Sequence, residues 1–239
     1  MKKLMLIVLI LSLFTTSWSW TNHEILVERV YYTLDLETQN KLNVTLLKEG
    51  AIAPDKVFHD TVRHSYPKSY IESKEWLFKA KQAYKNKDYN NASYFFGITA
   101  HYISDTFSAP HNVKKEPSKL HSKFDSTKYK PKVKCQNYPK EDDLNLSLYL
   151  STINKEIDWY QWVNTNNNSI AISGLDDSLK LLYPIALETF NASCNTLQTE
   201  IITSNYKLYN KQTNTLSVVF LMLILLYFII KKTKVKIRF

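Results

Sequence analysis

Glycine is scarce in this chain, and this scarcity limits the folds that are open to it. Only 3 of the 239 residues are glycine. A protein built from β-sheets needs many tight turns, and such turns commonly contain glycine. Long stretches of the sequence instead place apolar residues at helical spacing; in residues 23–36 these are Ile25, Leu26, Val30, Tyr31 and Leu34. We therefore expect an all-α fold.

Four further helices are predicted from the same spacing, over residues 70–84, 89–107, 144–163 and 175–209. The helix at 89–107 is strongly apolar and is expected to be buried at the centre of the domain. A polar linker at 164–168 separates the last two helices. The segment 110–140 is rich in Pro, Lys and Ser and is expected to be largely loop. The sequence has no visible internal repeat, so we expect one compact domain.

The N-terminal end, residues 1–17, has the features of a signal peptide. Lys2 and Lys3 precede an apolar run from residue 4 to residue 14, and small residues follow. Cleavage after residue 17 would make Trp18 the first residue of the mature protein, and cleavage after residue 19 would expose Trp20. Both cleavage sites follow a small residue. The protein is therefore expected to be exported.

A second apolar segment lies near the C-terminal end. We expect a transmembrane helix over residues 211–230 and a basic cytoplasmic tail over residues 231–239. The apolar run from 215 to 230 is roughly 24 Å long as a helix, and snorkelling lysines with local bilayer thinning can compensate for this short span. The alternative is an amphipathic helix of the core. The prediction is a single-pass protein of the cell membrane with an extracellular domain over residues 18–210.

The net charge of the chain, +9, comes mainly from its two ends. Seven of these charges belong to two lysines near the start and five basic residues after residue 230. The remaining domain carries only about +2, which does not favour a nucleic-acid surface. We therefore expect no stable nucleic-acid partner.

The exported part contains the only two cysteines, Cys135 and Cys194. One disulfide is plausible in an oxidising compartment, and two unpaired buried thiols are the alternative. Five sites fit the glycosylation pattern and support a surface location in a glycoprotein: Asn43, Asn91, Asn145, Asn167 and Asn191.

The histidines stand at spacings that suit metal binding. His101 and Asp105 are four residues apart on a predicted helix, so their side chains share one face. The pair His121 and Asp125 repeats this spacing, and His111 lies between the two pairs. Each pair alone is weak evidence, because such pairs are common on helix surfaces. Two pairs within 25 residues of an exported chain predict a metal site with nitrogen and oxygen ligands, which suits hydrolytic zinc.

A third group of candidate ligands lies upstream and comprises Asp55 and His64, with His59 as an alternative to His64. With this group added, the order is Trp, His, Asp, His, HxxxD, a further His six residues on, and HxxxD. That order resembles the zinc-dependent phospholipase C family, whose compact multi-helix fold is shared with the fungal single-strand nucleases. The resemblance covers residues 18–125 by motif, and the later helices are expected by analogy.

The resemblance implies a trinuclear zinc site that includes the mature N-terminus. One zinc would bind the free amine and carbonyl of Trp18 together with His23. Trp18 is favoured over Trp20 because it lies five residues before His23, the spacing seen in the nucleases. The resemblance implies that a second zinc binds Asp55, His64, His101 and Asp105, with Asp105 bridging to the first, and that a third zinc binds His111, His121 and Asp125.

The resemblance also implies a role for Asp55 beyond that of a ligand, because the matching family residue is discussed as the base that orients the attacking water. A carboxylate that bridges two zinc ions holds them roughly 3.5–4 Å apart, and such a pair activates water at about neutral pH. The phospholipases usually carry glutamate at the position of Asp125, whereas the nucleases carry aspartate.

We therefore expect a phospholipase C-like phosphodiesterase that acts on a phospholipid. The alternatives are a single-strand nuclease or nucleotidase on the same fold, and a non-enzymatic zinc-stabilised ectodomain. The predicted membrane tether favours a lipid substrate, since enzyme and substrate would share one surface. The following aromatic residues are expected mostly in the core, with a pocket for choline or a base as the alternative: Tyr66, Tyr94, Phe95, Phe96, Trp159 and Trp162.

Overall fold

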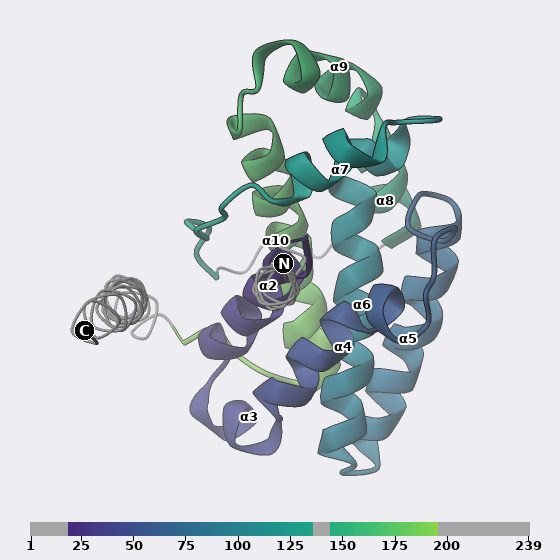
Figure 1. Ribbon diagram of the computed structural model, residues 1–239. Coiled ribbons are helices and arrows are strands. Elements are labelled where there is room, and N and C mark those ends of the chain that lie inside the picture. The colour runs from purple at the N-terminus through teal and green to yellow at the C-terminus, as the bar shows by residue number, and fades with distance from the viewer. Residues whose placement is uncertain (1–18, 136–143, 196–239) are drawn as a thin grey trace, which may run out of the picture. The chain divides into compact units, whose positions relative to one another are not determined.

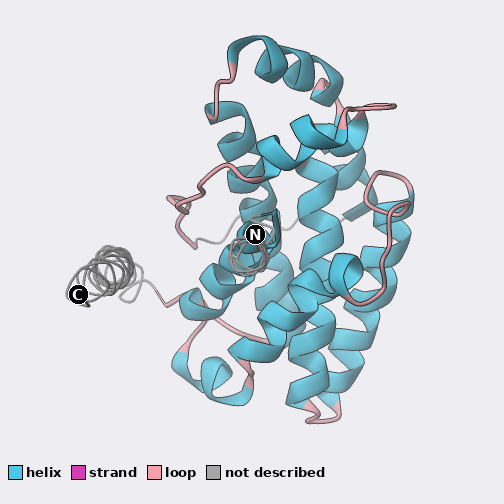
Figure 2. Ribbon diagram, in the orientation of Figure 1, coloured by secondary structure: helices cyan, strands magenta, loops and turns pink. Residues whose placement is uncertain are grey.

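The computed structural model describes residues 19–135 and 144–195 (Figure 1). All regular elements in these two ranges are helical (Figure 2), as the scarcity of glycine predicts. Trp18, the signal peptide and the predicted membrane segment lie outside the described residues. Within the described ranges, no helix combines the length and the apolar character needed to cross a membrane.

The described residues form ten helical elements, one of them a short 3-10 helix. They are α2 (Ser19–Thr33), α3 (Leu36–Lys41), α4 (Val44–Lys56), α5 (Lys68–Lys85), α6 (Tyr89–Phe107), the short 3-10 helix η1 (Pro110–Asn112), α7 (Ser118–Asp125), α8 (Leu144–Thr152), α9 (Lys155–Thr165) and α10 (Ser169–Phe190).

Side-chain caps fix where several of these helices begin. The side chain of Asp35 accepts a hydrogen bond from the Thr38 amide at the start of α3. The side chain of Asn43 caps α4 in the same way, and that of Asp88 caps α6. Such caps satisfy amide groups that have no partner within the helix. They explain why short polar residues stand immediately before these helices.

The helix α6 is the centre of the fold, as predicted. Every residue from Phe96 to Thr106 is buried. The helices α4 and α5 pack most extensively against it, and α10 and α2 also contact it. Apolar side chains from several of these helices form one main cluster, which includes Leu26, Val30, Phe96, Ile103 and Leu182.

Two glycines set the distance between α4 and α6. A Cβ atom on Gly97 would collide with the carbonyl oxygen of Leu47, and one on Gly50 would collide with that of Tyr94. The main chains of the two helices are therefore in direct contact at this crossing. Only glycine leaves enough room for such an approach.

The structure departs from the sequence-based expectation in four segments. In the segment 36–56 neither α3 nor α4 was predicted, and Gly50 and Pro54 interrupt the pattern of α4. The segment 110–140 contains α7 rather than loop alone. The predicted helix 144–163 is divided at Asn154, whose φ of 68° is incompatible with a continuous helix. The last helix begins at residue 169 and ends at Phe190, where Asn191 adopts a left-handed conformation.

Cys135 and Cys194 form a disulfide, which resolves the alternative left open by the sequence. The chain beside Cys194 is also held by main-chain hydrogen bonds to the end of α2. The Asp35 amide donates to the Ser193 carbonyl at 2.9 Å, and the Asn195 amide donates to the Thr33 carbonyl at 2.7 Å. The segment after α10 is thus attached to the first described helix.

Candidate metal centre

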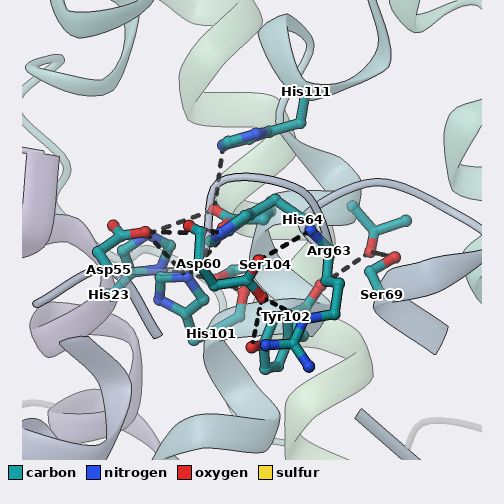
Figure 3. A network of polar contacts seen from close by, with 12 residues as sticks. His23, Asp55, Asp60, Arg63, His64, Ser69, His101, Tyr102, Ser104 and His111 are labelled. Atoms are coloured by element: carbon teal, nitrogen blue, oxygen red, sulfur yellow. Dashed lines mark hydrogen bonds and ion pairs between the residues drawn. The ribbon is translucent and has the colours of Figure 1, made fainter. Parts of the chain in front are cut away.

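The fold gathers eight of the nine predicted ligands into one region, although they come from six segments. These are His23 on α2, Asp55 on α4, His64 in the loop before α5, His101 and Asp105 on α6, His111 on η1, and His121 and Asp125 on α7. Figure 3 shows histidine rings from different segments converging on one another. The ninth predicted ligand, Trp18, lies outside the described residues.

Asp105 is the central residue of this region. Its Oδ2 atom lies 2.6 Å from Nδ1 of His64 and 3.0 Å from Nε2 of His101. Its Oδ1 atom lies 3.3 Å from Nε2 of His23 and 3.4 Å from Nε2 of His111. One buried carboxylate therefore contacts four histidines from four different segments.

The ligand atoms form three groups in which all atoms lie within 4.8 Å of one another. The groups are His23 with His101 and Asp105, Asp55 with His64 and His101, and His111 with His121 and Asp125. His101 belongs to two of them. The number of groups equals the number of zinc ions that the resemblance implies.

His101 is held with one ring nitrogen toward the centre. Its Nδ1 atom lies 2.8 Å from the carbonyl oxygen of Ala51, which can only accept a hydrogen bond. Nδ1 therefore carries a proton, and Nε2 is the ring nitrogen that faces Asp105 and Asp55. Metal-binding histidines usually donate their other ring N–H to an oxygen in this way.

His23 is oriented by Ser104 in a similar manner. The Ser104 hydroxyl donates its proton to the carbonyl oxygen of His101 at 2.9 Å. Its oxygen therefore accepts a hydrogen bond from Nδ1 of His23, also at 2.9 Å. This leaves Nε2 of His23 free to bind an ion beside Asp105. Ser104 was not predicted, because a serine one residue before an expected ligand carries no signal of its own.

His64 takes its position from the conformation of its loop. Its Nε2 atom lies 2.6 Å from the carbonyl oxygen of Asp60, so Nδ1 is the atom that faces the centre. The Asp60 carboxylate accepts hydrogen bonds from Nε of Arg63 at 2.9 Å and from the hydroxyl of Tyr102 at 2.8 Å. These contacts attach the loop to α6. His59, the alternative ligand, is exposed and belongs to none of the three groups.

The third group lies on α7 and η1. Nε2 of His121 lies 2.9 Å from Oδ2 of Asp125, one helical turn later. Nδ1 of His121 lies 2.9 Å from Oε1 of Glu116. Glu116 therefore orients His121 as Ala51 orients His101. It was not predicted, because it lies outside α7 and shares no helical spacing with His121.

Electrostatics within the metal-free centre is dominated by Asp105. Burial opposes its ionisation, but the charges of His111, His101 and His23 hold its pKa well below the ordinary value. Burial likewise opposes a charge on His64, whereas the hydrogen bond to Asp105 raises its pKa to about 9. For His23 burial is the largest effect, followed by the charge of His101, and its pKa is lowered to about 4.

The centre opens to solvent on one side. The side chain of His101 is fully buried, whereas that of Asp55 is 32% exposed. His121 and Asp125 are also partly exposed, at 21% and 20%. Asp55, His121 and Asp125 are therefore the ligands most accessible to solvent, whereas His101 and Asp105 are buried.

The donor atoms fit zinc of the hydrolytic type. They are imidazole nitrogens and carboxylate oxygens, and the two cysteines are joined in a disulfide elsewhere. Structural zinc sites favour cysteine, whereas catalytic sites use histidine and carboxylate ligands.

The aromatic residues Trp159 and Trp162 pack with Phe124 in a separate buried cluster, as expected for core residues.

Comparison with known proteins agrees with this geometry. Residues 22–172 match the family model described as zinc dependent phospholipase C. This range contains all eight described ligands. No curated protein and no solved structure gives a significant match.

Proposed function

We propose, from the premise that this chain belongs to the zinc-dependent phospholipase C family, that it is a phospholipase C-like phosphoric ester hydrolase. The observation that carries the proposal is the contact of one buried carboxylate, Asp105, with four histidines from four segments. A merely structural ion would need only one such group of ligands. Three adjacent groups suit a centre that binds and cleaves a phosphate ester.

The proposed centre holds three zinc ions. One ion would be held by Asp55, His64, His101 and Asp105, a second by Asp105, His23 and the amine and carbonyl of Trp18, and a third by His111, His121 and Asp125. Zinc ions of this kind supply Lewis acidity, which polarises phosphoryl oxygens and lowers the pKa of water. The buried position of Asp105 suits a carboxylate shared by two ions.

Asp55 is the proposed catalytic base. Its Oδ1 atom lies 3.6 Å from Nε2 of His64 and 3.7 Å from Nε2 of His101. Asp55 and Asp105 both lie beside these histidines, and Asp55 is the more exposed of the two. A carboxylate in this position can orient an incoming water molecule and accept its proton. A general base must lie within hydrogen-bonding distance of the water it deprotonates, and the exposed Asp55 carboxylate can meet this requirement.

The proposed substrate is a phospholipid, cleaved on the glycerol side of its phosphodiester. We also propose that residues 211–230 anchor the protein in the cell membrane, with the domain outside and the basic residues 231–239 in the cytoplasm. The family match supports the lipid substrate, and the apolar segment of the sequence is the basis of the proposed anchor. Enzyme and lipid would then share one surface.

A second candidate function is that of a single-strand nuclease or nucleotidase. Aspartate at position 125, where the phospholipases usually carry glutamate, favours it. The third candidate is a non-enzymatic domain in which zinc only stabilises the fold. The three candidates differ in which substrate, if any, is turned over.

The test uses the processed full chain in detergent, loaded with zinc. Phospholipids, single-stranded DNA and nucleotide monophosphates are offered separately, and zinc per chain is measured by mass spectrometry. Release of diacylglycerol by a protein with about three zinc ions is the expected result. Asp55→Asn should abolish turnover, while Glu37→Gln, an exposed carboxylate on α3 outside the centre, should not. Turnover of nucleotides alone would favour the second candidate. Bound zinc without any turnover would favour the third.

A further inference from the structure

A stripe of apolar side chains on α8 and α9 is exposed to solvent. Its six members, which we call the α8–α9 stripe, are between 49% and 64% exposed: Leu146, Tyr149, Leu150, Ile153, Ile157 and Tyr160. Single exposed apolar residues are common on protein surfaces. Six exposed apolar residues on two consecutive helices instead mark a surface that binds another apolar surface.

These residues belong to two consecutive helices. Leu146, Tyr149 and Leu150 follow the i, i+3, i+4 spacing of one face of α8, and Ile153 comes directly after that helix. Ile157 and Tyr160 are three residues apart and share one face of α9. The other face of α8 is also partly apolar, since Leu148 is fully buried against α6 and its neighbours. A helix that is apolar on both faces requires a second apolar environment besides the protein core.

The inner face of α9 packs on the elements that carry the third ligand group. The Trp162 ring lies 5.1 Å from that of Phe124, and the Trp159 ring lies 6.0 Å from it. Phe124 is adjacent to Asp125 on α7, and α9 also contacts η1, which carries His111. The exposed residues on the outer face of α9 are therefore separated from the ligands by one layer of helix.

The α8 end of the stripe borders the loop that carries His64. The hydroxyl of Tyr66 donates to Oδ1 of Asn145 at 3.0 Å, and its ring lies 5.7 Å from that of Tyr149. The same loop exposes Val62, at 59%. The stripe thus adjoins two of the segments that form the metal centre.

The chemistry of the stripe resembles that of a membrane interface. Tyr149 and Tyr160 combine an aromatic ring with a hydroxyl group, and such side chains favour the boundary between acyl chains and headgroups. A groove of about 470 Å³ beside the stripe is lined by Leu150 and Ile153 and also by the ion pair of Lys180 with Asp177.

We propose that the α8–α9 stripe docks on the surface of a phospholipid bilayer and thereby places the metal centre beside its lipid substrate. This inference rests on the proposed function. A bilayer is favoured over a second copy of the chain because the predicted membrane segment, residues 211–230, would keep the domain at a bilayer surface. Amphipathic helices bind there by inserting only their apolar face.

The first experiment measures the position of the stripe directly. A spin label is placed at Ile157→Cys in the full chain, in nanodiscs of phosphatidylcholine with some phosphatidylserine and one chain per disc. Collision with oxygen, which concentrates in lipid, should exceed collision with a water-soluble reagent. The control is Leu36→Cys, a similarly exposed site at the start of α3, which Figure 1 places at the opposite end of the described helices from α9. Equal aqueous access at both labels would overturn the proposal.

The second experiment separates docking from chemistry. The double variant Leu150→Ser with Ile157→Ser should hydrolyse lipid in nanodiscs roughly tenfold more slowly, because lost apolar contacts weaken interfacial binding. Its turnover of a soluble phosphodiester in detergent should be unchanged, and Leu36→Ser should change neither rate. An equal loss on both substrates would contradict docking.

The spin label at position 157 also distinguishes two other outcomes. If the unaltered protein hydrolyses neither substrate, the proposed function fails, and the collision data alone decide whether the stripe contacts lipid. If the label at position 157 is shielded only in discs that hold two chains, a second copy covers the stripe and the bilayer proposal is wrong.

Discussion

Nδ1 of His64 lies 2.6 Å from Oδ2 of Asp105, although the two residues are 41 positions apart in the sequence. This contact brings the loop between α4 and α5 onto the central helix α6. Its counterpart is the contact of His101 with the same carboxylate oxygen at 3.0 Å. Asp105 therefore determines the relative position of ligands that lie in separate segments, and its charge is the first feature to test.

Asp105→Asn keeps the shape of the side chain but removes its negative charge. We expect the variant to lose both of the zinc ions that Asp105 is proposed to hold and to hydrolyse substrate at least about 10²-fold more slowly. Asp125→Asn is the control, because Asp125 belongs to the third group alone. Zinc content by mass spectrometry and turnover should be measured together. Full zinc content with normal turnover in Asp105→Asn would exclude the shared-carboxylate arrangement.

The stability of the metal-free protein should be greatest near pH 6.5. His64 and His121 have pKa values raised to about 9, so the stability they contribute is present below about pH 6.5 and is lost as the pH rises to 9. His23 has a pKa lowered to about 4, so stability is also lost as the pH falls from about 6.5 toward 4.

Zinc should reverse the alkaline part of this profile, because it binds the unprotonated histidines. Thermal unfolding in the presence of a chelator, compared with unfolding in zinc, measures both effects. A metal-free melting temperature that increased steadily between pH 6.5 and pH 9 would show that these histidines are not held by their carboxylate partners.

Tyr102→Phe should weaken zinc binding without touching a ligand. Its hydroxyl donates to Asp60, whose carbonyl oxygen orients His64. Loss of such an outer contact typically lowers metal affinity about tenfold. Tyr31→Phe is a matched control, because it removes a hydrogen bond of similar length to the Gln39 carbonyl, outside the centre. Equal zinc affinities in the two variants, measured by chelator competition, would argue against a positioning role for the loop.

The mature N-terminus should be required for one of the zinc ions. The helix α2 begins at Ser19, four residues before His23, and Trp18 precedes Ser19 in the sequence. A protein extended by one methionine before Trp18 should bind one zinc fewer, because an amide nitrogen cannot replace the amine. The comparison needs N-terminal sequencing of both proteins. An extended protein with an unchanged zinc count would remove the tryptophan amine from the ligand set.

Local geometry explains which parts of the centre the sequence predicts well. The pairs His101–Asp105 and His121–Asp125 are one helical turn apart, so their proximity follows from helix geometry alone. Asp55 and His64 come from different segments, and only the family resemblance suggested that they meet. The role of these residues as zinc ligands stays a prediction.

The residues that orient the ligands could not be predicted from the sequence. Ser104 and Asp60 act through hydrogen bonds that exist only after the helices have packed.

The helix α4 could not be predicted from the sequence for a similar reason. Gly50 and Pro54 usually interrupt helices, but Gly50 is needed at the crossing with α6 and Pro54 lies in the last turns of the helix. Tertiary packing thus overrides the local preference of both residues.

The contact of α4 with α6 at Gly50 and Gly97 has a consequence for the entropy of ion binding. Main-chain atoms have no rotamers, so the distance between these two helices does not vary with side-chain motion. Asp55 is carried by one helix, and His101 and Asp105 by the other. Fewer rotatable bonds must therefore become ordered when an ion binds between them. The ordering cost is incurred when the chain folds, and the ligand spacing already exists before any ion arrives.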